Sequence, residues 1–466
     1  MRWLLPLAAA TAALLAVPAT GANLPRKAAL AVRLGPAPQG TSGALAVEVF
    51  PGGTASAIGL RNGDLVVSAG GRPVTRSADL VAYASSLHAG EKVEITVRRD
   101  GRDVRLGGKA KPRPLEAYAD ATVDYGAVPF RGGLIRDILV SPKAVANPPV
   151  LFLLQGFSCA SIDSGPPEDS YRRLGEELLK RGVAYYRVEK PGLGDSSGTP
   201  ACADIDFTAE LEAFRAAYKH LIEDRHVDPD RIFMFGHSLG GLEAPLLAAE
   251  TPPRGVAAYG TVLRNWADYH LDIDRYQTFL ANGTDPGEAA AATERDRELF
   301  RRFYFGKEAP AQLAAGNPAY GAAMREVMGW DGTDRLFGRN YRFMQELAGL
   351  PLASAWRRAK TNVLALYGES DIVAIDDRDH KMIADIADFY RPGSGRFVEV
   401  AKTGHGMTLV GNRHEYREKA MAAEGAPPDG PFNPQVAEIL AGWIKDSMER
   451  PPVRLQAERQ VPAPQS

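Results

Sequence analysis

Apolar residues recur in short alternating runs up to about residue 114 and in longer, unbroken runs after about residue 118. In the first part, the alternation predicts strands over Ala44–Phe50 and Lys92–Arg98, and apolar spacing predicts a helix over Ser77–Leu87. The stretch Lys109–Pro114, which is rich in Lys, Arg and Pro, marks the end of this part. The pattern therefore predicts a small α+β domain over residues 25–114.

Fully apolar strands alternate with helices over the rest of the chain. Strands of this kind are predicted at Pro149–Leu154, Val183–Val188, Arg231–Phe235, Thr361–Tyr367 and Gly395–Val400. Strands that are apolar on both sides favour a mostly parallel sheet with helices on both faces. The alternation lapses over about 264–355, where a helical insertion of the size of a lid is predicted. We therefore expect an α/β domain over residues 118–450.

The two ends of the chain have a different composition. Arg2 is followed by the apolar run Trp3–Val17 and the small residues Ala19–Ala22, which is the layout of a secretory signal peptide over residues 1–22. An uncleaved anchor is the alternative, but the run is short for a membrane span. No later segment approaches that length, so we expect a periplasmic or secreted protein with no integral membrane segment once mature. The Pro-rich residues 451–466 are predicted to be a disordered tail.

Composition excludes several classes of function. The length of 466 residues exceeds one typical domain. Lys and Arg total 55 against 57 for Asp and Glu, a net charge of −2, so the chain has no excess positive charge with which to attract nucleic acid. We expect no nucleic-acid partner. The motifs of zinc peptidases, calcium loops and dinucleotide sites are missing from the sequence, so no metal and no cofactor is expected.

Cys159 and Cys202 are the two cysteines of the chain. Outside the cytoplasm, a pair of thiols is expected to form a disulfide. The alternative is that both remain as buried free thiols.

One serine stands in a context suited to nucleophilic catalysis. The predicted strand Ile232–Phe235 runs into Gly236-His237-Ser238-Leu239-Gly240 and then into a predicted helix. This strand–turn–helix arrangement is what a G-x-S-x-G nucleophile elbow requires. Gly236 and Gly240 suit a strained turn in which the backbone passes close to its neighbours. Ser238 is therefore the predicted nucleophile.

A serine nucleophile needs a histidine base and a carboxylate, in the chain order Ser, Asp or Glu, His. Of the eight histidines, His405 follows the last predicted strand in a glycine-flanked loop and is the predicted base. His237 is interpreted as a supporting residue, and the other six histidines as surface residues. Asp371 follows the strand before that of His405 and is the predicted acid, with Glu369 as the substitute.

These segments together resemble the α/β-hydrolase superfamily over residues 118–450, and among its members EstD-type carboxylesterases and serine aminopeptidase-like hydrolases. The loop Gly192–Gly198 resembles the Gly-x-Gly-x-Ser loop of that superfamily. The resemblance implies an oxyanion hole formed by the backbone N–H groups of Phe157 and Leu239, with Gly156 permitting the turn.

The first domain resembles the PDZ domains of bacterial envelope proteases. The residues that carry the likeness are Pro51–Ala55 and Ala57–Asp64, where two glycine-marked turns bracket a short helix. The resemblance implies a groove that holds a peptide C-terminus near Arg33–Gly35. A PDZ-like fold that serves only as a structural cap is the alternative.

The predicted function is hydrolysis of carboxylic esters through a Ser-His-Asp triad and an acyl-enzyme intermediate. The substrate would be a small-molecule ester or a peptide. The first alternative is a serine peptidase or aminopeptidase that uses the PDZ-like domain to position peptides. The second is a non-catalytic protein whose PDZ-like groove does the binding.

Overall fold

The computed structural model describes residues 24–35, 37–163, 165, 167–422 and 430–455. The predicted signal peptide, residues 1–22, lies outside the described residues, and so do residues 456–466 of the predicted tail. The first residues of that tail are described and contain a 3-10 turn, η3 (Val453–Leu455). Val453 is buried, and Arg454 forms an ion pair with Asp230. The tail therefore starts as a packed segment.

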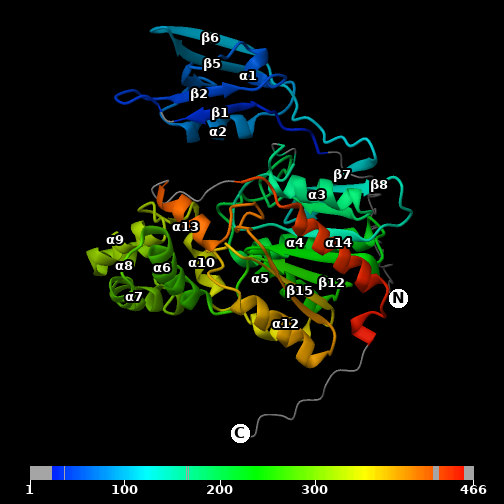
Figure 1. The fold of residues 1–466 in the computed structure, drawn as a ribbon. Coiled ribbons are helices and arrows are strands. Elements are labelled where there is room, and N and C mark those ends of the chain that lie inside the picture. The colour runs from blue at the N-terminus through cyan, green and yellow to red at the C-terminus, as the bar shows by residue number, and fades with distance from the viewer. Residues whose placement is uncertain (1–23, 36, 164, 166, 423–429, 456–466) are drawn as a thin grey trace, which may run out of the picture.

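The amino-terminal part is a small antiparallel sheet with two helices (Figure 1). Its strand order is β1-β2-β3-β5-β6, with β4 beside β3, and its core is built from small and β-branched side chains such as Ala44, Val66, Val93 and Ile95. This agrees with the predicted α+β domain. The elements are β1 (Val32–Gly35), β2 (Ala44–Val49), α1 (Thr54–Ala57), β3 (Leu65–Ala69), β4 (Arg72–Pro73), α2 (Ser77–Ser86), β5 (Lys92–Arg99) and β6 (Arg102–Lys109).

The rest of the chain is built on an eight-stranded sheet of order β16-β15-β12-β11-β9-β10-β8-β7. The strands from β16 to β10 are parallel, whereas β8 and β7 run antiparallel at one edge. The predicted mostly parallel sheet is confirmed. Its strands are β7 (Ala121–Phe130), β8 (Gly133–Pro142), β9 (Val150–Leu154), β10 (Ala184–Val188), β11 (Ile232–His237), β12 (Gly255–Tyr259), β15 (Asn362–Gly368) and β16 (Gly395–Val400).

Helices cover both faces of this sheet, as its fully buried central strands require. Side chains of α3 and α14 pack on one face, and those of α4, α5, α11 and α12 pack on the other. The bounds are α3 (Ser170–Lys180), α4 (Phe207–Glu223), η1 (Pro229–Arg231), α5 (Gly240–Glu250), α11 (Leu352–Arg358), α12 (Arg378–Tyr390), α13 (Arg413–Ala422) and α14 (Pro434–Met448).

A helical insertion separates β12 from β15 and lies to one side of the sheet (Figure 1). Its buried apolar side chains belong to the same hydrophobic core as those of α5, so the insertion is packed onto the domain. None of the described helices is long and apolar enough to cross a membrane. The insertion contains α6 (Trp266–Asn282), α7 (Pro286–Phe300), η2 (Arg301–Phe305), α8 (Pro310–Gly316), α9 (Pro318–Val327), β13 (Arg335–Leu336), β14 (Arg339–Asn340) and α10 (Tyr341–Leu347).

Candidate active site

The candidate residues follow the carboxyl ends of parallel strands. Ser238 follows β11, Asp371 lies just beyond β15 and His405 lies beyond β16. Because β11, β12, β15 and β16 are consecutive parallel neighbours in the sheet, their ends meet at one edge. Open α/β sheets bind ligands at this edge.

Ser238 occupies a strained turn between β11 and α5. Its φ of 55° is in the left-handed region, which a residue with a side chain seldom adopts. A Cβ on Gly236 would lie 2.4 Å from the carbonyl oxygen of Gly240, and a Cβ on Gly240 would lie 2.0 Å from that of Leu154. Both positions therefore require glycine, and the Ser238 N–H is held by Tyr259 O at 2.8 Å.

Asp371 and His405 form a hydrogen-bonded pair. His405 Nδ1 lies 2.9 and 3.0 Å from the two oxygens of the buried Asp371 carboxylate. Burial alone would raise the pKa of Asp371, but His405 and the backbone N–H of Ala374 outweigh it and hold this pKa below its usual value. An ionised carboxylate can only accept, so Nδ1 carries a proton, and in the neutral imidazole the lone pair is then on Nε2.

The pair lies close to the serine turn. A Cβ on Gly260, which follows the residue that holds the Ser238 N–H, would lie 2.8 Å from Asp371 Oδ2 and 3.0 Å from His405 Nδ1. Within the described residues, the Ser238 hydroxyl makes no hydrogen bond to His405. Such contacts often tighten only when substrate binds.

The backbone N–H groups of Leu239 and Phe157, both near Ser238, have no hydrogen-bond partner among the described residues. Leu239 precedes α5, so its N–H lies at the positive end of the helix. The loop that carries Phe157 approaches the serine closely, since a Cβ on Gly156 would lie 3.3 Å from Ser238 Cβ.

A chain of hydrogen bonds connects three loops around Ser238. The Gly156 N–H donates to the Tyr171 hydroxyl at 2.9 Å, and this hydroxyl lies 2.7 Å from Nδ1 of His237. His237 Nε2 lies 2.8 Å from the carbonyl oxygen of His405. Burial, with a smaller contribution from His405, lowers the pKa of His237 to about 4. The ring is therefore neutral, accepts from Tyr171 at Nδ1 and donates at Nε2, which agrees with its predicted supporting role.

A buried charged cluster lies behind the Gly156 loop. Lys190 is 2.8 Å from Glu210, and Arg339 donates to the same carboxylate at 2.6 Å. Lys190 Nζ also donates to Gly156 O at 2.6 Å, and Arg339 donates to Phe157 O at 3.2 Å. Burial and Glu210 raise the pKa of neighbouring Glu243 well above its usual value. Lys190 was missed by the sequence reasoning, although it follows an apolar strand, as the other candidates do.

Cys159 and Cys202 form a disulfide, with Cα atoms 5.8 Å apart. The bridge ties the segment just after Phe157 to the segment that follows the Gly192–Gly198 loop. Arg339 Nη2 donates to Cys202 O at 3.2 Å, so the bridge lies beside the buried cluster.

The prediction that six histidines are surface residues is wrong for two of them. His270 is 5% exposed, and its Nε2 donates to Val327 O at 3.1 Å while its Nδ1 accepts from the Tyr304 hydroxyl at 2.7 Å. His380 is fully buried and accepts the Thr261 N–H at 3.1 Å. Burial lowers the pKa of both to about 4. Each sits on a helix whose inner face is covered by a segment distant in sequence, which local patterning does not reveal.

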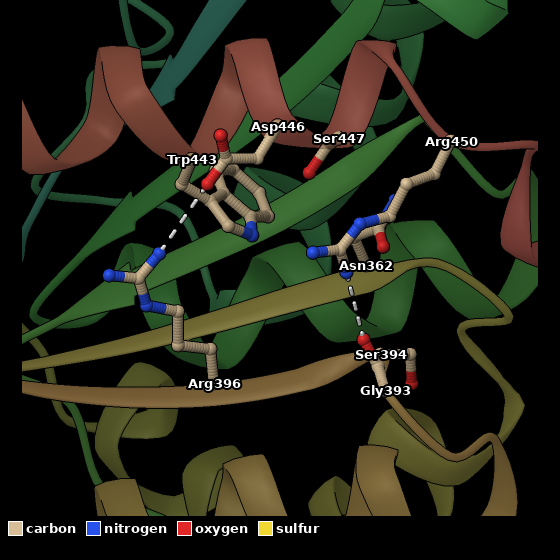
Figure 2. A pocket seen from close by; sticks show the side chains of 8 residues that line it. All are labelled: Asn362, Gly393, Ser394, Arg396, Trp443, Asp446, Ser447 and Arg450. Atoms are coloured by element: carbon tan, nitrogen blue, oxygen red, sulfur yellow. Dashed lines mark hydrogen bonds and ion pairs between the residues drawn. The ribbon is translucent and has the colours of Figure 1, made fainter.

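A small pocket lies at the amino-terminal ends of the strands, on the side of the sheet away from Ser238 and near the start of β15 (Figure 2). An ion pair of 3.8 Å between Arg396 and Asp446 borders it. Over the ranges that the structure describes, no three His, Cys, Asp or Glu side chains converge in a way that could hold a metal ion. The pocket is lined by Asn362, Gly393, Ser394, Arg396, Trp443, Asp446, Ser447 and Arg450.

Comparison with known proteins finds curated relatives that match part of the chain. One from Pseudomonas savastanoi pv. phaseolicola, described as "Probable periplasmic serine endoprotease DegP-like", is 35% identical over 97 residues, covering 21% of this chain and 17% of the relative. Another of the same description, from Ectopseudomonas mendocina, is 42% identical over 175 residues, covering 32% of this chain and 36% of the relative. The chain thus spans between about a sixth and a third of these relatives.

Solved structures with a similar course of the chain include Est1E from Butyrivibrio proteoclasticus, at 16% identity and a TM-score of 0.42, covering 70% of this chain and 99% of that one. The esterase domain of a Rhodothermus marinus protein has 16% identity and a TM-score of 0.41, covering 70% and 98%.

Two family models match the chain. The PDZ domain model matches residues 29–107, and the Alpha/beta hydrolase family model matches residues 151–419. The match to the Alpha/beta hydrolase family model covers more than half of this chain, and the match to the PDZ domain model lies ahead of it. The chain therefore belongs to the alpha/beta hydrolase family and carries a PDZ domain ahead of the hydrolase fold.

Proposed function

We propose that this protein is a serine hydrolase that cleaves carboxylic esters, with Ser238, His405 and Asp371 as its catalytic triad. The observation that carries the proposal is the bifurcated contact of His405 Nδ1 with the two oxygens of the buried Asp371 carboxylate, at 2.9 and 3.0 Å, beside a serine held at a φ of 55°. This contact leaves Nε2 as the atom that can take the Ser238 proton.

The reaction would proceed in two acyl-transfer steps. Ser238 Oγ attacks the ester carbonyl carbon while His405 Nε2 takes its proton, and the alcohol leaves with that proton. Water then attacks the acyl-serine, with His405 acting as base and then as acid. The unpartnered N–H groups of Phe157 and Leu239 would stabilise the oxyanion in both steps.

Cleavage of peptides is the second candidate, and the PDZ match over residues 29–107 favours it. β1 is an edge strand, so a peptide could add beside it, with its C-terminus near the loop after Gly35. An aminopeptidase would also need a carboxylate for the substrate's amino group. Glu243, one candidate for that role, is fully buried beside Lys190 and Arg339, and burial raises its pKa well above the usual value, which disfavours the charged form that an ammonium group would need. Ester hydrolysis is therefore the first choice.

The protein is proposed to act in the periplasm or outside the cell. The disulfide between Cys159 and Cys202 supports this location, because such bonds persist in oxidising compartments. The partial relatives described as periplasmic agree with it.

The test compares the purified mature chain with Ser238→Ala on acyl esters of increasing length and on amino-acid and dipeptide anilides. We expect the wild type to hydrolyse short esters and the variant to lose roughly 10⁴-fold or more of that activity. Efficient anilide cleavage would move the protein to the peptidases. No turnover on either panel, together with no labelling of Ser238 by a fluorophosphonate, would contradict both and favour a binding role.

A further inference from the structure

Lys190 is a buried cation just beyond the carboxyl end of β10, and the proposed reaction does not use it directly. Neither its side chain nor that of its partner Glu210 has exposed surface, and Nζ lies 2.8 Å from the Glu210 carboxylate. Removing a charged amine from water costs stability unless its donors are used. One of these donors is used on the backbone, in a bond of 2.6 Å to Gly156 O.

The Gly156 carbonyl and the Phe157 N–H belong to the same peptide unit. A trans peptide is planar, and its C=O and N–H point in opposite directions. The described part of the chain contains no cis peptide bond. The bond from Lys190 to Gly156 O therefore also sets the direction of the Phe157 N–H, which must point away from the buried cluster.

The neighbouring groups of the loop are held as well. Tyr171 accepts the Gly156 N–H at 2.9 Å, and Arg339 donates to Phe157 O at 3.2 Å. Of the N–H and C=O groups of Gly156 and Phe157, the Phe157 N–H is thus the one that lacks a partner in the residues described. Loss of the Lys190 contact would free this peptide unit to rotate and turn its N–H away from Ser238.

We propose that Lys190 is a positioning residue that orients the Phe157 N–H and so keeps the oxyanion hole formed before substrate binds. The inference rests on the proposed serine-hydrolase function. A donor aimed at the oxyanion stabilises the transition state more than the bound ester. Loss of Lys190 should therefore lower kcat and leave KM nearly unchanged.

The experiment uses the full mature chain with Lys190→Met, which keeps the length of the side chain and removes its charge and donors. Lys219→Met is the matched control, since Lys219 is 70% exposed on α4. Three quantities are measured: kcat and KM on a short p-nitrophenyl ester, and the Ki of a trifluoromethyl ketone, which adds to the serine as a tetrahedral oxyanion. The phosphonylation rate of Ser238 by a fluorophosphonate is recorded alongside.

We expect Lys190→Met to lower kcat by roughly 100-fold, the scale for losing one oxyanion donor, and to raise the Ki of the ketone by a similar factor. KM should change by less than about threefold, and the pH at which the activity is half-maximal should stay the same, because His405 is untouched. Lys219→Met should match the wild type in every measurement.

Several results would overturn the proposal. One is a folded Lys190→Met protein with unchanged kcat and Ki, and another is an equal rise in KM and Ki, which would make Lys190 a substrate-binding group. If Lys190→Met does not fold, Lys190→Arg keeps the charge and displaces the donor, and a wild-type Ki in that variant would contradict the proposal. If the fluorophosphonate labels Ser238 of the wild type but the wild type cleaves no ester, the phosphonylation rates of the wild type and of Lys190→Met are compared instead, and equal rates would contradict the proposal. A wild type that does neither refutes the proposed function and this inference together.

Discussion

The hydroxyl of Tyr171 lies 2.7 Å from Nδ1 of His237, and this contact links α3 to the residue that precedes Ser238. The same hydroxyl accepts the Gly156 N–H at 2.9 Å, while the other ring nitrogen of His237 reaches His405 O at 2.8 Å. Tyr171 and His237 together thus connect the Gly156 loop, the serine turn and the loop that carries His405.

Tyr171→Phe should therefore slow ester hydrolysis with little change in fold. The variant leaves the Gly156 N–H and His237 Nδ1 without their partner, and an unsatisfied buried group costs about 1–3 kcal/mol. If half of this cost, about 0.5–1.5 kcal/mol, raises the activation barrier through misplacement of the loops, kcat falls by roughly two- to tenfold. Steady-state kinetics and thermal unfolding measure the two effects.

Tyr218→Phe is the matched control for this prediction, because the buried Tyr218 hydroxyl has no hydrogen-bond partner in the described structure. It should keep wild-type kinetics. Equal activities of the two variants would show that the hydroxyl of Tyr171 has no role in aligning the loops.

Asp371→Asn should lower kcat by about 10⁴-fold, because an amide at this position can stabilise the wrong tautomer of His405. Glu369→Gln is the informative comparison. Glu369 was the substitute acid in the sequence analysis, but in the structure its carboxylate accepts the Lys402 N–H at 2.7 Å. We expect the activity of Glu369→Gln to stay within about threefold of the wild type. A large loss of activity in Glu369→Gln but not in Asp371→Asn would mean that Glu369, and not Asp371, is the acid of the triad.

The buried histidines should make stability depend on pH between about 6.5 and about 4. Burial lowers the pKa values of His237, His270 and His380 from 6.5 to about 4. In this interval the unfolded chain binds a proton at each histidine that the folded chain does not bind, so these groups lower the free energy of unfolding as pH falls. Glu189, whose pKa burial raises to about 7, contributes with the opposite sign, as does Glu243.

A single substitution isolates the contribution of one histidine to the pH dependence of the free energy of unfolding. His270→Gln should reduce the slope of the unfolding free energy against pH by up to one proton, or about 1.4 kcal/mol per pH unit. Urea unfolding at several pH values from 7 to 4.5 measures the slope. His414→Gln is the control, since the His414 side chain is 80% exposed, and it should leave the slope unchanged. Identical slopes for both variants would contradict a depressed pKa at His270.

Arg26 should be important for stability, because it connects the segment ahead of the PDZ domain to the hydrolase fold. It forms ion pairs with Asp163 and with Asp195, at 2.5 Å from the latter, and neither carboxylate side chain is exposed. Arg26→Met would leave these charges poorly compensated, although Arg136 still contacts Asp195 at 3.2 Å. We expect a loss of about 3 kcal/mol in the free energy of unfolding.

Chemical unfolding of Arg26→Met and Arg33→Met checks this. Arg33 is 63% exposed and pairs with Glu48 on the PDZ domain, so its loss should cost less than about 1 kcal/mol. Similar costs for the two variants would mean that the junction contributes no more than a surface ion pair.

Local pattern was sufficient for the sheet and for the candidate residues at its edge. Apolar runs long enough to be buried on both sides imply parallel strands, and the residues that follow such strands must gather at one edge. Ser238 was predicted from the G-x-S-x-G turn, and Asp371 and His405 from the chain order Ser, Asp, His and from their places after the last two predicted strands. The G-x-S-x-G turn was also readable, because the glycines at 236 and 240 are imposed by contacts with the adjoining turn and strand.

Contacts between distant segments could not be read in this way. Tyr171 lies on a helix, and nothing in its neighbourhood in the sequence indicates that its hydroxyl meets His237, 66 residues away. Lys190 and Glu210 come from a strand end and a helix, and their burial depends on packing that brings Arg339 from the insertion against them. His270 and His380 looked like surface residues because periodicity gives the faces of a helix but not the segment that covers each face. The strand pattern thus specifies which edge holds the chemistry, whereas tertiary packing selects the partners that orient each group.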